Sequence, residues 1–321
     1  SSYLWNTGSG TVSIVTAPST TSTYTVTVTG GNGCTASDNA IIFVNASPIA
    51  NAGSDQAVCF GQTVFLSASG GSSYLWSTGA GTSSINVTPT TSSTYTVTVT
   101  SGNGCTGSDA VSITVNANPA ANAGFDQTIC KGQSTMLTAS GGISYLCSTG
   151  GNTSTITVVP TTTTNYIVTV TNSAGCIATD NVLVNVNPIP NADAGANQMI
   201  CQVQSVTLTA TGGVSYLWST GYGTQSISVT PSVTTTYSVN VSAANGCTAS
   251  DIVSVYVNAL PPASAGADQI ICYGQQASLT ASGGSSYTWS TGSTSTSINV
   301  TPTTTTTYVV TVVSGNGCSA S

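Results

Sequence analysis

A repeat of about 71 residues runs through the whole chain almost without insertions, and it constrains the fold more than any other feature. One proline marks the same position in successive copies: Pro48, Pro119, Pro190 and Pro261. A unit of this length is near the lower limit for a domain with a core of its own. We therefore expect five domains: a partial repeat at residues 1–47, whole repeats at 48–118, 119–189 and 190–260, and a partial repeat at 261–321.

Each repeat has the alternation of apolar and polar residues that is typical of β-strands. In the second copy it is present over residues 64–68, 85–87, 95–99 and 111–115, and a further short strand is expected at 74–76. The segments are separated by Gly and Asn turns, such as Gly102-Asn103-Gly104, and no stretch has a helical period. Strands with one apolar face, spaced by turns every 8–12 residues, are typical of a sandwich. The predicted fold is all-β, a tandem array of Ig-like (PKD-like) β-sandwich domains.

Large aromatic residues occupy two positions in nearly every repeat and are expected to form its core, because each buries roughly 150–250 Å². The tryptophan position holds Trp5, Trp76, Trp218 and Trp289. The tyrosine position holds Tyr24, Tyr95, Tyr166, Tyr237 and Tyr308. Tyr95, at the start of the penultimate strand, is similar to the tyrosine corner of Ig-like sandwiches. Cys147 fills the tryptophan position of the third repeat, where we expect a buried, unpaired thiol. A sugar-binding aromatic platform is the weaker interpretation, because the fold itself requires a core tryptophan.

The composition excludes several classes of function. Only 3% of the residues are charged, the formal net charge is −7, and Lys131 is the one basic residue. A single basic residue argues against binding to nucleic acid, whose counterions are displaced by Lys and Arg, and against binding to anionic lipid. No apolar run reaches the roughly 18–20 residues of a membrane span. The absence of His and Glu removes imidazole metal sites, His-activated nucleophiles and paired glutamates. We therefore expect neither an enzyme nor a cofactor.

The eight aspartates fall mostly into two repeated positions and have almost no cationic partner. Their expected role is to accept backbone N–H bonds in turns. The alternative is Ca²⁺ at the domain junctions, because hard cations prefer clustered oxygen ligands. The ligands for such a site would come from Asp55, Asp109, Asp126, Asp180, Asp251 and Asp268. Asn197, which replaces an aspartate in one copy, argues against calcium, as does the lack of a dense Asp-x-Asp run.

Several motifs resemble a known family of repeats. The runs are Asp55-Gln56-Ala57-Val58-Cys59, Tyr74-Leu75-Trp76-Ser77-Thr78-Gly79, Thr94-Tyr95-Thr96-Val97 and Asn103-Gly104-Cys105. They are similar to the Ig-like and PKD-like repeats of giant Bacteroidota surface proteins, such as SprB-type gliding and surface adhesins and proteins secreted by the type IX system. The resemblance covers the whole chain and implies a cell-surface adhesive role, although such modules serve as spacers in many proteins.

Nine of the ten cysteines form two columns, which predicts disulfides and an oxidising, extracellular setting. The Cys34 column comprises Cys34, Cys105, Cys176, Cys247 and Cys318, and the Cys59 column comprises Cys59, Cys130, Cys201 and Cys272. The preferred pairing lies within a repeat, because small secreted domains are commonly stapled internally: Cys59–Cys105, Cys130–Cys176, Cys201–Cys247 and Cys272–Cys318. Cys34 would then have no partner, and the chain, which opens in mid-pattern at Ser1-Ser2-Tyr3, is expected to lack its true N-terminus.

One geometric fact opposes this pairing. In a simple Ig sandwich the two columns lie at opposite ends of a domain, some 20 Å apart, whereas bridged Cα atoms lie within about 7 Å. Either the first strand is displaced, so that Cys59 lies near the last strand, or the bonds join neighbouring domains. Bonds between domains would join Cys59 to Cys176, Cys130 to Cys247 and Cys201 to Cys318.

Three functions remain open at this stage. The first is an extracellular structural and adhesive protein, a stalk or filament on the bacterial surface that contacts its own neighbouring repeats and other copies of itself. The second is a tandem module that binds surface polysaccharide, with weak sites gaining avidity. The third is a spacer within a larger secreted enzyme.

Overall fold

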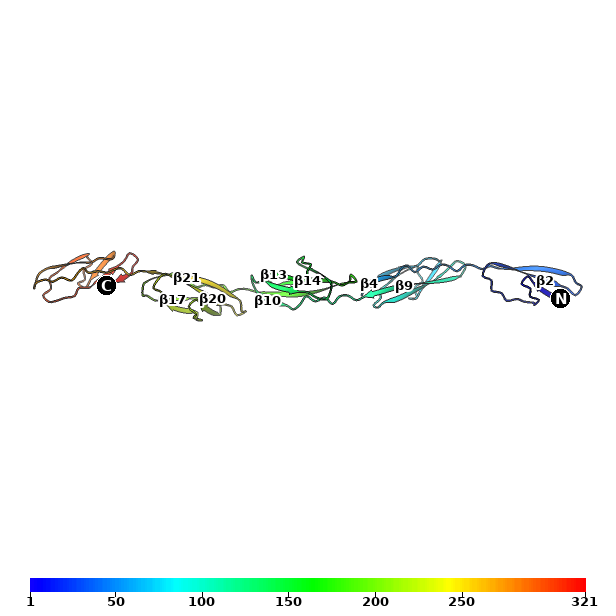
Figure 1. Cartoon of the computed structure of the whole chain (residues 1–321), viewed down its shortest axis with the longest axis horizontal. Helices are drawn as coiled ribbons and strands as arrows, with labels where there is room; N and C mark the ends of the chain where they lie inside the picture. The colour runs from blue at the N-terminus through cyan, green and yellow to red at the C-terminus, as the bar shows by residue number, and fades with distance from the viewer. The chain divides into compact units, whose positions relative to one another are not determined.

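The computed structural model describes all 321 residues as β-strands joined by turns (Figure 1). It contains no helix of the length and apolarity needed to cross a membrane. By its internal contacts the chain divides into two compact units. The first contains residues 1–125, 136–156 and 166–182, and the second contains residues 126–135, 157–165 and 183–321. The division falls inside the third repeat.

In the first unit, the second repeat shows the complete strand pattern. Its strands are β4 (Gln56–Cys59), β5 (Val64–Ser67), β6 (Ser73–Trp76), β7 (Ser84–Val87), β8 (Ser93–Thr100) and β9 (Thr106–Asn116). One sheet has the order β4-β9-β8-β6 and the other pairs β5 with β7. All pairs are antiparallel except β4 with β9, which is parallel. The first repeat contributes β1 (Ser2–Trp5), β2 (Ser22–Thr29) and β3 (Thr35–Ile42) in one sheet.

In the second unit, the fourth repeat has the same arrangement. Its strands are β16 (Gln198–Cys201), β17 (Val206–Thr209), β18 (Ser215–Trp218), β19 (Ser226–Val229), β20 (Thr235–Ser242) and β21 (Thr248–Asn258). They form the sheets β16-β21-β20-β18 and β17-β19, and β17, β20 and β21 lie together in Figure 1. The fifth repeat contains β22 (Ala277–Thr280), β23 (Ser286–Trp289), β24 (Ser297–Val300), β25 (Val310–Val313) and β26 (Ser319–Ala320).

The strands of the third repeat are distributed over both units. They are β10 (Gln127–Cys130), β11 (Thr135–Thr138), β12 (Ser144–Cys147), β13 (Thr155–Val158), β14 (Thr164–Thr171) and β15 (Ile177–Asn187). Within the first unit β12 pairs with β14 in antiparallel register, and within the second unit β10 pairs with β15 in parallel. These pairs repeat those of the neighbouring copies.

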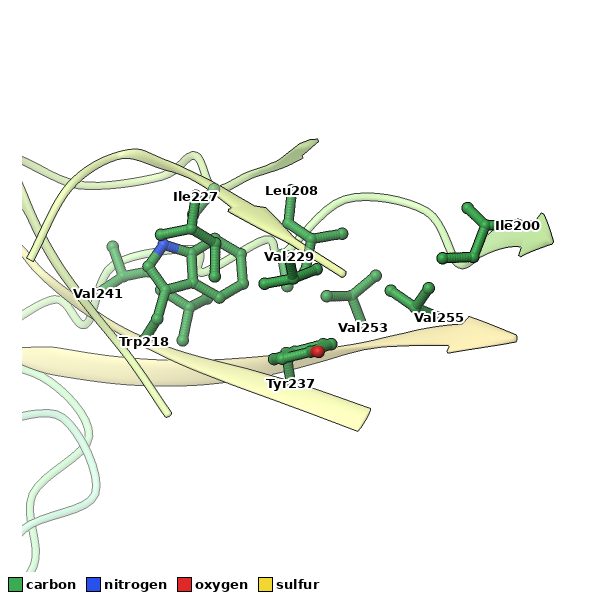
Figure 2. Close-up of a cluster of buried hydrophobic side chains, with 12 residues drawn as sticks. Ile200, Leu208, Trp218, Ile227, Val229, Tyr237, Val241, Val253 and Val255 are labelled. Atoms are coloured by element: carbon green, nitrogen blue, oxygen red, sulfur yellow. The ribbon is translucent and has the colours of Figure 1, made fainter. Parts of the chain in front are cut away.

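The core of the fourth repeat shows why alternation produces this fold. Leu208 comes from the two-stranded sheet and Trp218 and Val253 come from the four-stranded sheet, yet all three belong to one buried cluster. Figure 2 shows the Trp218 ring beside Ile227, with Leu208 and Val229 in the same cluster. Every second residue of β20 points into this cluster and the residues between are Ser, Thr and Asn. The fourth repeat is therefore a sandwich of two sheets with one apolar interior, and the second and fifth repeats have the same two-sheet arrangement. The chain is an all-β array of Ig-like domains.

Residues 56–59 are not among the strands predicted from alternation, and they determine where the cysteines lie. β4 runs parallel to the last part of β9, with Gln56 opposite Ile113 and Cys59 opposite Asn116. The same register recurs with Cys201 opposite Asn258. The Cys59 column therefore lies where each repeat ends and the next begins.

Candidate functional site: the stapled junctions between repeats

The other cysteine column lies at the opposite end of each repeat, on the turn before the last long strand. Asn172 starts this turn in the third repeat: its side-chain Oδ1 accepts hydrogen bonds from the N–H groups of Ala174 and Cys176, both 3.0 Å long. Gly175 follows with φ of 79°, a left-handed conformation that favours glycine. The turn places Cys176 at the start of β15, where its side chain is fully buried.

Disulfides join these two columns across the junctions. Cys59 bonds Cys176 in the first unit, and Cys130 bonds Cys247 and Cys201 bonds Cys318 in the second, each pair 117 residues apart. The Cα–Cα distances are 5.5, 5.7 and 5.6 Å, within the range of unstrained bridges. The preferred intradomain pairing, Cys59–Cys105, Cys130–Cys176, Cys201–Cys247 and Cys272–Cys318, is therefore wrong in this structure, and the interdomain alternative holds.

The parallel strand explains the correction. Cys59 lies opposite Asn116, at the end of β9, whereas Cys105 immediately precedes the start of that strand at Thr106. The whole length of β9 separates the two positions, which is about 36 Å at about 3.3 Å per residue. No disulfide spans such a distance.

Polar contacts accompany the disulfides at each junction. The Asn172 side chain donates to the carbonyl oxygen of Ala117 at 2.8 Å, and Asn245 donates to that of Pro188 at 3.0 Å. The sulfur of Cys176 lies 4.0 Å from the carbonyl oxygen of Asn116. The junction between the first and second repeats has a similar contact but no disulfide: the Cys105 sulfur lies 3.7 Å from the carbonyl oxygen of Asn45.

Four cysteines are unpaired: Cys34, Cys105, Cys147 and Cys272. Three of them belong to the columns, and for each of these a partner 117 residues away would fall outside residues 1–321. The fourth is Cys147 in the tryptophan position.

The aspartates tie the first segment of each repeat to its last strand. Asp109 on β9 accepts a hydrogen bond from the N–H of Ala52 at 2.8 Å. Asp55 in turn accepts one from the N–H of Ser112, also on β9, at 2.8 Å. Equivalent bonds are made by Asp180 with Ala123, Asp251 with Ala194, Asp126 with Leu183 and Asn197 with Ser254. Asp268 has the position of Asp55 in the last repeat, where the equivalent donor would fall outside residues 1–321. Asn197 makes the same bond as an aspartate, so the position requires an oxygen acceptor rather than a charge.

These bonds also bear on the Ca²⁺ alternative. No group of three or more His, Cys, Asp or Glu side chains gathers in a way that could hold a metal ion. The aspartate oxygens instead accept backbone N–H groups, and these bonds lower the pKa values of three carboxyl groups. For Asp109 the N–H of Ala52 contributes most and that of Ala110 less, and Asp180 and Asp251 follow the same pattern.

The direction of these pKa shifts predicts a loss of stability in acid. A carboxyl group whose pKa is lowered by folding stabilises the fold above its unfolded pKa of about 3.9, and this contribution is lost as the pH falls through the lower folded value. We expect melting temperatures that change little between pH 7 and 5 and fall below about pH 4. The triple variant Asp109→Asn, Asp180→Asn, Asp251→Asn keeps an acceptor oxygen without titrating, so it should lose less stability on acidification. Parallel curves for the two proteins would contradict this role.

The tryptophan position is the centre of each core. Trp76, Trp218 and Trp289 are each 2% exposed, whereas Trp5 is half-buried. The indole N–H of Trp76 donates to the carbonyl oxygen of Thr82 at 3.0 Å, and that of Trp218 donates to Thr224 at 3.0 Å. In the tyrosine position, Tyr166 and Tyr237 are buried, and Tyr24, Tyr95 and Tyr308 are half-buried. Tyr74, from a second repeated tyrosine position, makes the local hydrogen bond of the kind seen in a tyrosine corner: its hydroxyl donates to the carbonyl oxygen of Gly71 at 3.0 Å.

Cys147 leaves space in the third repeat that tryptophan fills in the others. Its side chain is half-buried rather than buried, and it lines an apolar pocket that is partly open to solvent. Leu137, Ile156 and Tyr166 line the same pocket. Thr153, the counterpart of Thr224, also lines this pocket.

Comparison with known proteins adds similarity of fold only. No protein-family model matches the chain, and no curated protein matches it in sequence. Among solved structures, the titin fragment I67–I69 is 11% identical, with a TM-score of 0.36 over 67% of this chain and 100% of that one. A Ca²⁺-stabilised adhesin with which an Antarctic bacterium binds ice is 15% identical, with a TM-score of 0.31 over 74% of this chain and 82% of that one. The first eight Ig domains of Down syndrome cell adhesion molecule are 13% identical, with a TM-score of 0.26 over 84% of this chain and 44% of that one.

Proposed function

We propose that the chain is part of an extracellular structural and adhesive array, a stalk or filament that holds a binding region away from a bacterial surface. The pairing of cysteines between successive repeats is the observation that carries this proposal. A disulfide inside a sandwich stabilises that sandwich alone. A disulfide across a junction fixes one repeat to the next, which benefits a protein that works as a string of repeats.

The chemistry of the chain supports the same role. Disulfides persist in oxidising compartments, which favours a position outside the cell. With no His, no Glu and one Lys, the chain offers no set of groups for acid–base or nucleophilic catalysis, so we assign it no enzymatic activity. The resemblance to Bacteroidota surface adhesins supports a cell-surface location.

The functional domains in this proposal are the five repeats, at 1–47, 48–118, 119–189, 190–260 and 261–321. Their partners are the neighbouring repeats, with other copies of the chain and surface polysaccharide as external partners. Near-identical copies suit a spacer better than a set of diversified binding sites, so we place the specific binding region outside these residues.

Small-angle X-ray scattering tests the proposal on the isolated, oxidised chain. Five sandwiches of roughly 35 Å in line would form a rod with a radius of gyration of about 45 Å or more. A single compact domain of this length would give about 20 Å. A concentration series controls for association. A radius of gyration close to that of the compact domain would contradict the stalk.

Antibody labelling of intact cells tests the location. Antibodies raised against the chain should label the producing cells without permeabilisation, and labelling only after permeabilisation would contradict the extracellular assignment.

A further inference from the structure

The disulfides create a second route along the chain that is much shorter than the polypeptide itself. From Cys59 the route crosses to Cys176, follows the backbone to Cys201, and crosses again to Cys318. The polypeptide covers the same interval only by passing through every residue from Cys59 to Cys318. Any force applied along the array is carried by the shorter route once that route is straight.

The segment between Cys176 and Cys201 already contains little slack. Its first part forms the continuous strand β15. Its last part, Ala194 to Cys201, runs beside β21 in constant register: the N–H of Ala194 bonds Asp251, Asn197 accepts from Ser254, and Cys201 lies opposite Asn258. Residues 188–197 join β15 to β16 (Gln198–Cys201), and Gly195 among them has a left-handed φ of 84°. A strand rises about 3.3 Å per residue against a limit of about 3.3–3.6 Å for a fully stretched chain, so pulling gains very little length in β15 and β16, and the gain is confined to residues 188–197.

The same route recurs one repeat later. Cys130 bonds Cys247, and from there β21 leads toward Cys272, the next member of the Cys59 column. The route through Cys59–Cys176 and Cys201–Cys318 crosses two of the junctions, and the route through Cys130–Cys247 crosses the junction between them.

We propose that the array is a tether of fixed length, in which the disulfides and the extended segments between them carry tension past the sandwich cores. Under force the third and fourth repeats stay folded, because the covalent route around them has only residues 188–197 left to straighten before it carries the load. This inference rests on the proposed structural role. Its test is independent of the scattering experiment, because the greatest length that the disulfide-bonded chain can reach under force does not depend on how the repeats are arranged in solution.

Single-molecule pulling from the two ends of the full chain tests the proposal. In the oxidised protein the limiting route consists of the chain before Cys59, the segment from Cys176 to Cys201 and the chain after Cys318. At about 3.6 Å per residue, with the two disulfides added, this route is about 320 Å long. After reduction the limit is the whole polypeptide, about 1,150 Å, so we expect a 3- to 4-fold gain in final length.

Two matched double variants make the test specific. Cys130→Ser with Cys247→Ser removes a disulfide that is not on the limiting route, and the final length should stay at about 320 Å. Cys201→Ser with Cys318→Ser removes one that is on it. The shortest route then runs back from Cys176 to Cys130, crosses to Cys247 and continues to the end, which is about 650 Å. Both variants lose one disulfide, so a general loss of stability would affect them alike.

The alternatives have distinct signatures. Disulfides within each repeat would give a limit of about 510 Å, and unpaired thiols would give about 1,150 Å without reductant. Either length in the oxidised wild type would overturn the tether. Equal lengths for the two double variants would overturn it as well.

Discussion

Replacing Cys147 with tryptophan should stabilise the third repeat by about 3–5 kcal/mol, the size of the effect when a large aromatic is gained or lost in a core. The pocket beside Cys147 is lined by Leu137, Ile156 and Tyr166. Thr153 is the counterpart of Thr224, whose carbonyl oxygen accepts the indole N–H of Trp218, so we expect the new side chain to find a partner for its one donor.

Hydrogen exchange read by peptide is the suitable measurement, because an array of repeats does not unfold in one transition. Protection should rise in peptides from residues 136–182 and stay constant in the other repeats. The reciprocal variant Trp218→Cys should lower protection in the fourth repeat by a comparable amount. If Cys147→Trp left protection unchanged or reduced it, the third repeat would have remodelled its core around the smaller residue.

Substituting Gly212 with alanine should destabilise the fourth repeat by about 3 kcal/mol or more, through overpacking added to backbone strain. Gly212 has φ of 100°, and a Cβ placed there would collide with the carbonyl group of Asn191. This close approach joins the loop that enters the repeat to the turn before β18, so relief requires the backbone to move.

Gly221→Ala is the matched control, because Gly221 has a similar φ of 87° but no atom within 4 Å of the added Cβ. It should cost only the left-handed strain, about 1–2 kcal/mol. Peptide-resolved hydrogen exchange in increasing denaturant gives both values. Equal losses for the two variants would show that strain alone matters at Gly212.

The sandwich could be predicted from sequence because alternation records burial directly. Val97, Val99, Val111 and Ile113 are predicted inward and are all at most 1% exposed. Segment 56–59 could not be predicted in this way, because it is only four residues long and pairs with a strand far away in the chain. The position of this segment is marked by a constant separation of 57 residues between Asp55 or Asn197 and the residue whose N–H each accepts. This separation can be recognised only in the structure, after the strands have been paired.

The disulfide pairing was predicted wrongly because the general preference for bonds within a domain was given more weight than the distance between the two cysteine columns. Strand length places the two columns at opposite ends of a repeat, which is what the positions of Cys59 and Cys105 show. The preference for bonds within a domain reflects how disulfides pair in small secreted proteins that consist of one domain. In a tandem array the end of one domain meets the start of the next, so the nearest cysteine belongs to the neighbour.

The overlap of the disulfides also changes what a single proteolytic cut can do. Each bond joins cysteines 117 residues apart, and the next bond begins well inside that interval, one repeat further on, so consecutive bonds overlap along the chain. A cut anywhere between Cys59 and Cys318 therefore falls inside at least one closed ring, and the two fragments remain joined through sulfur. In the proposed extracellular array, a single protease cut between Cys59 and Cys318 would therefore leave the two ends of the chain connected.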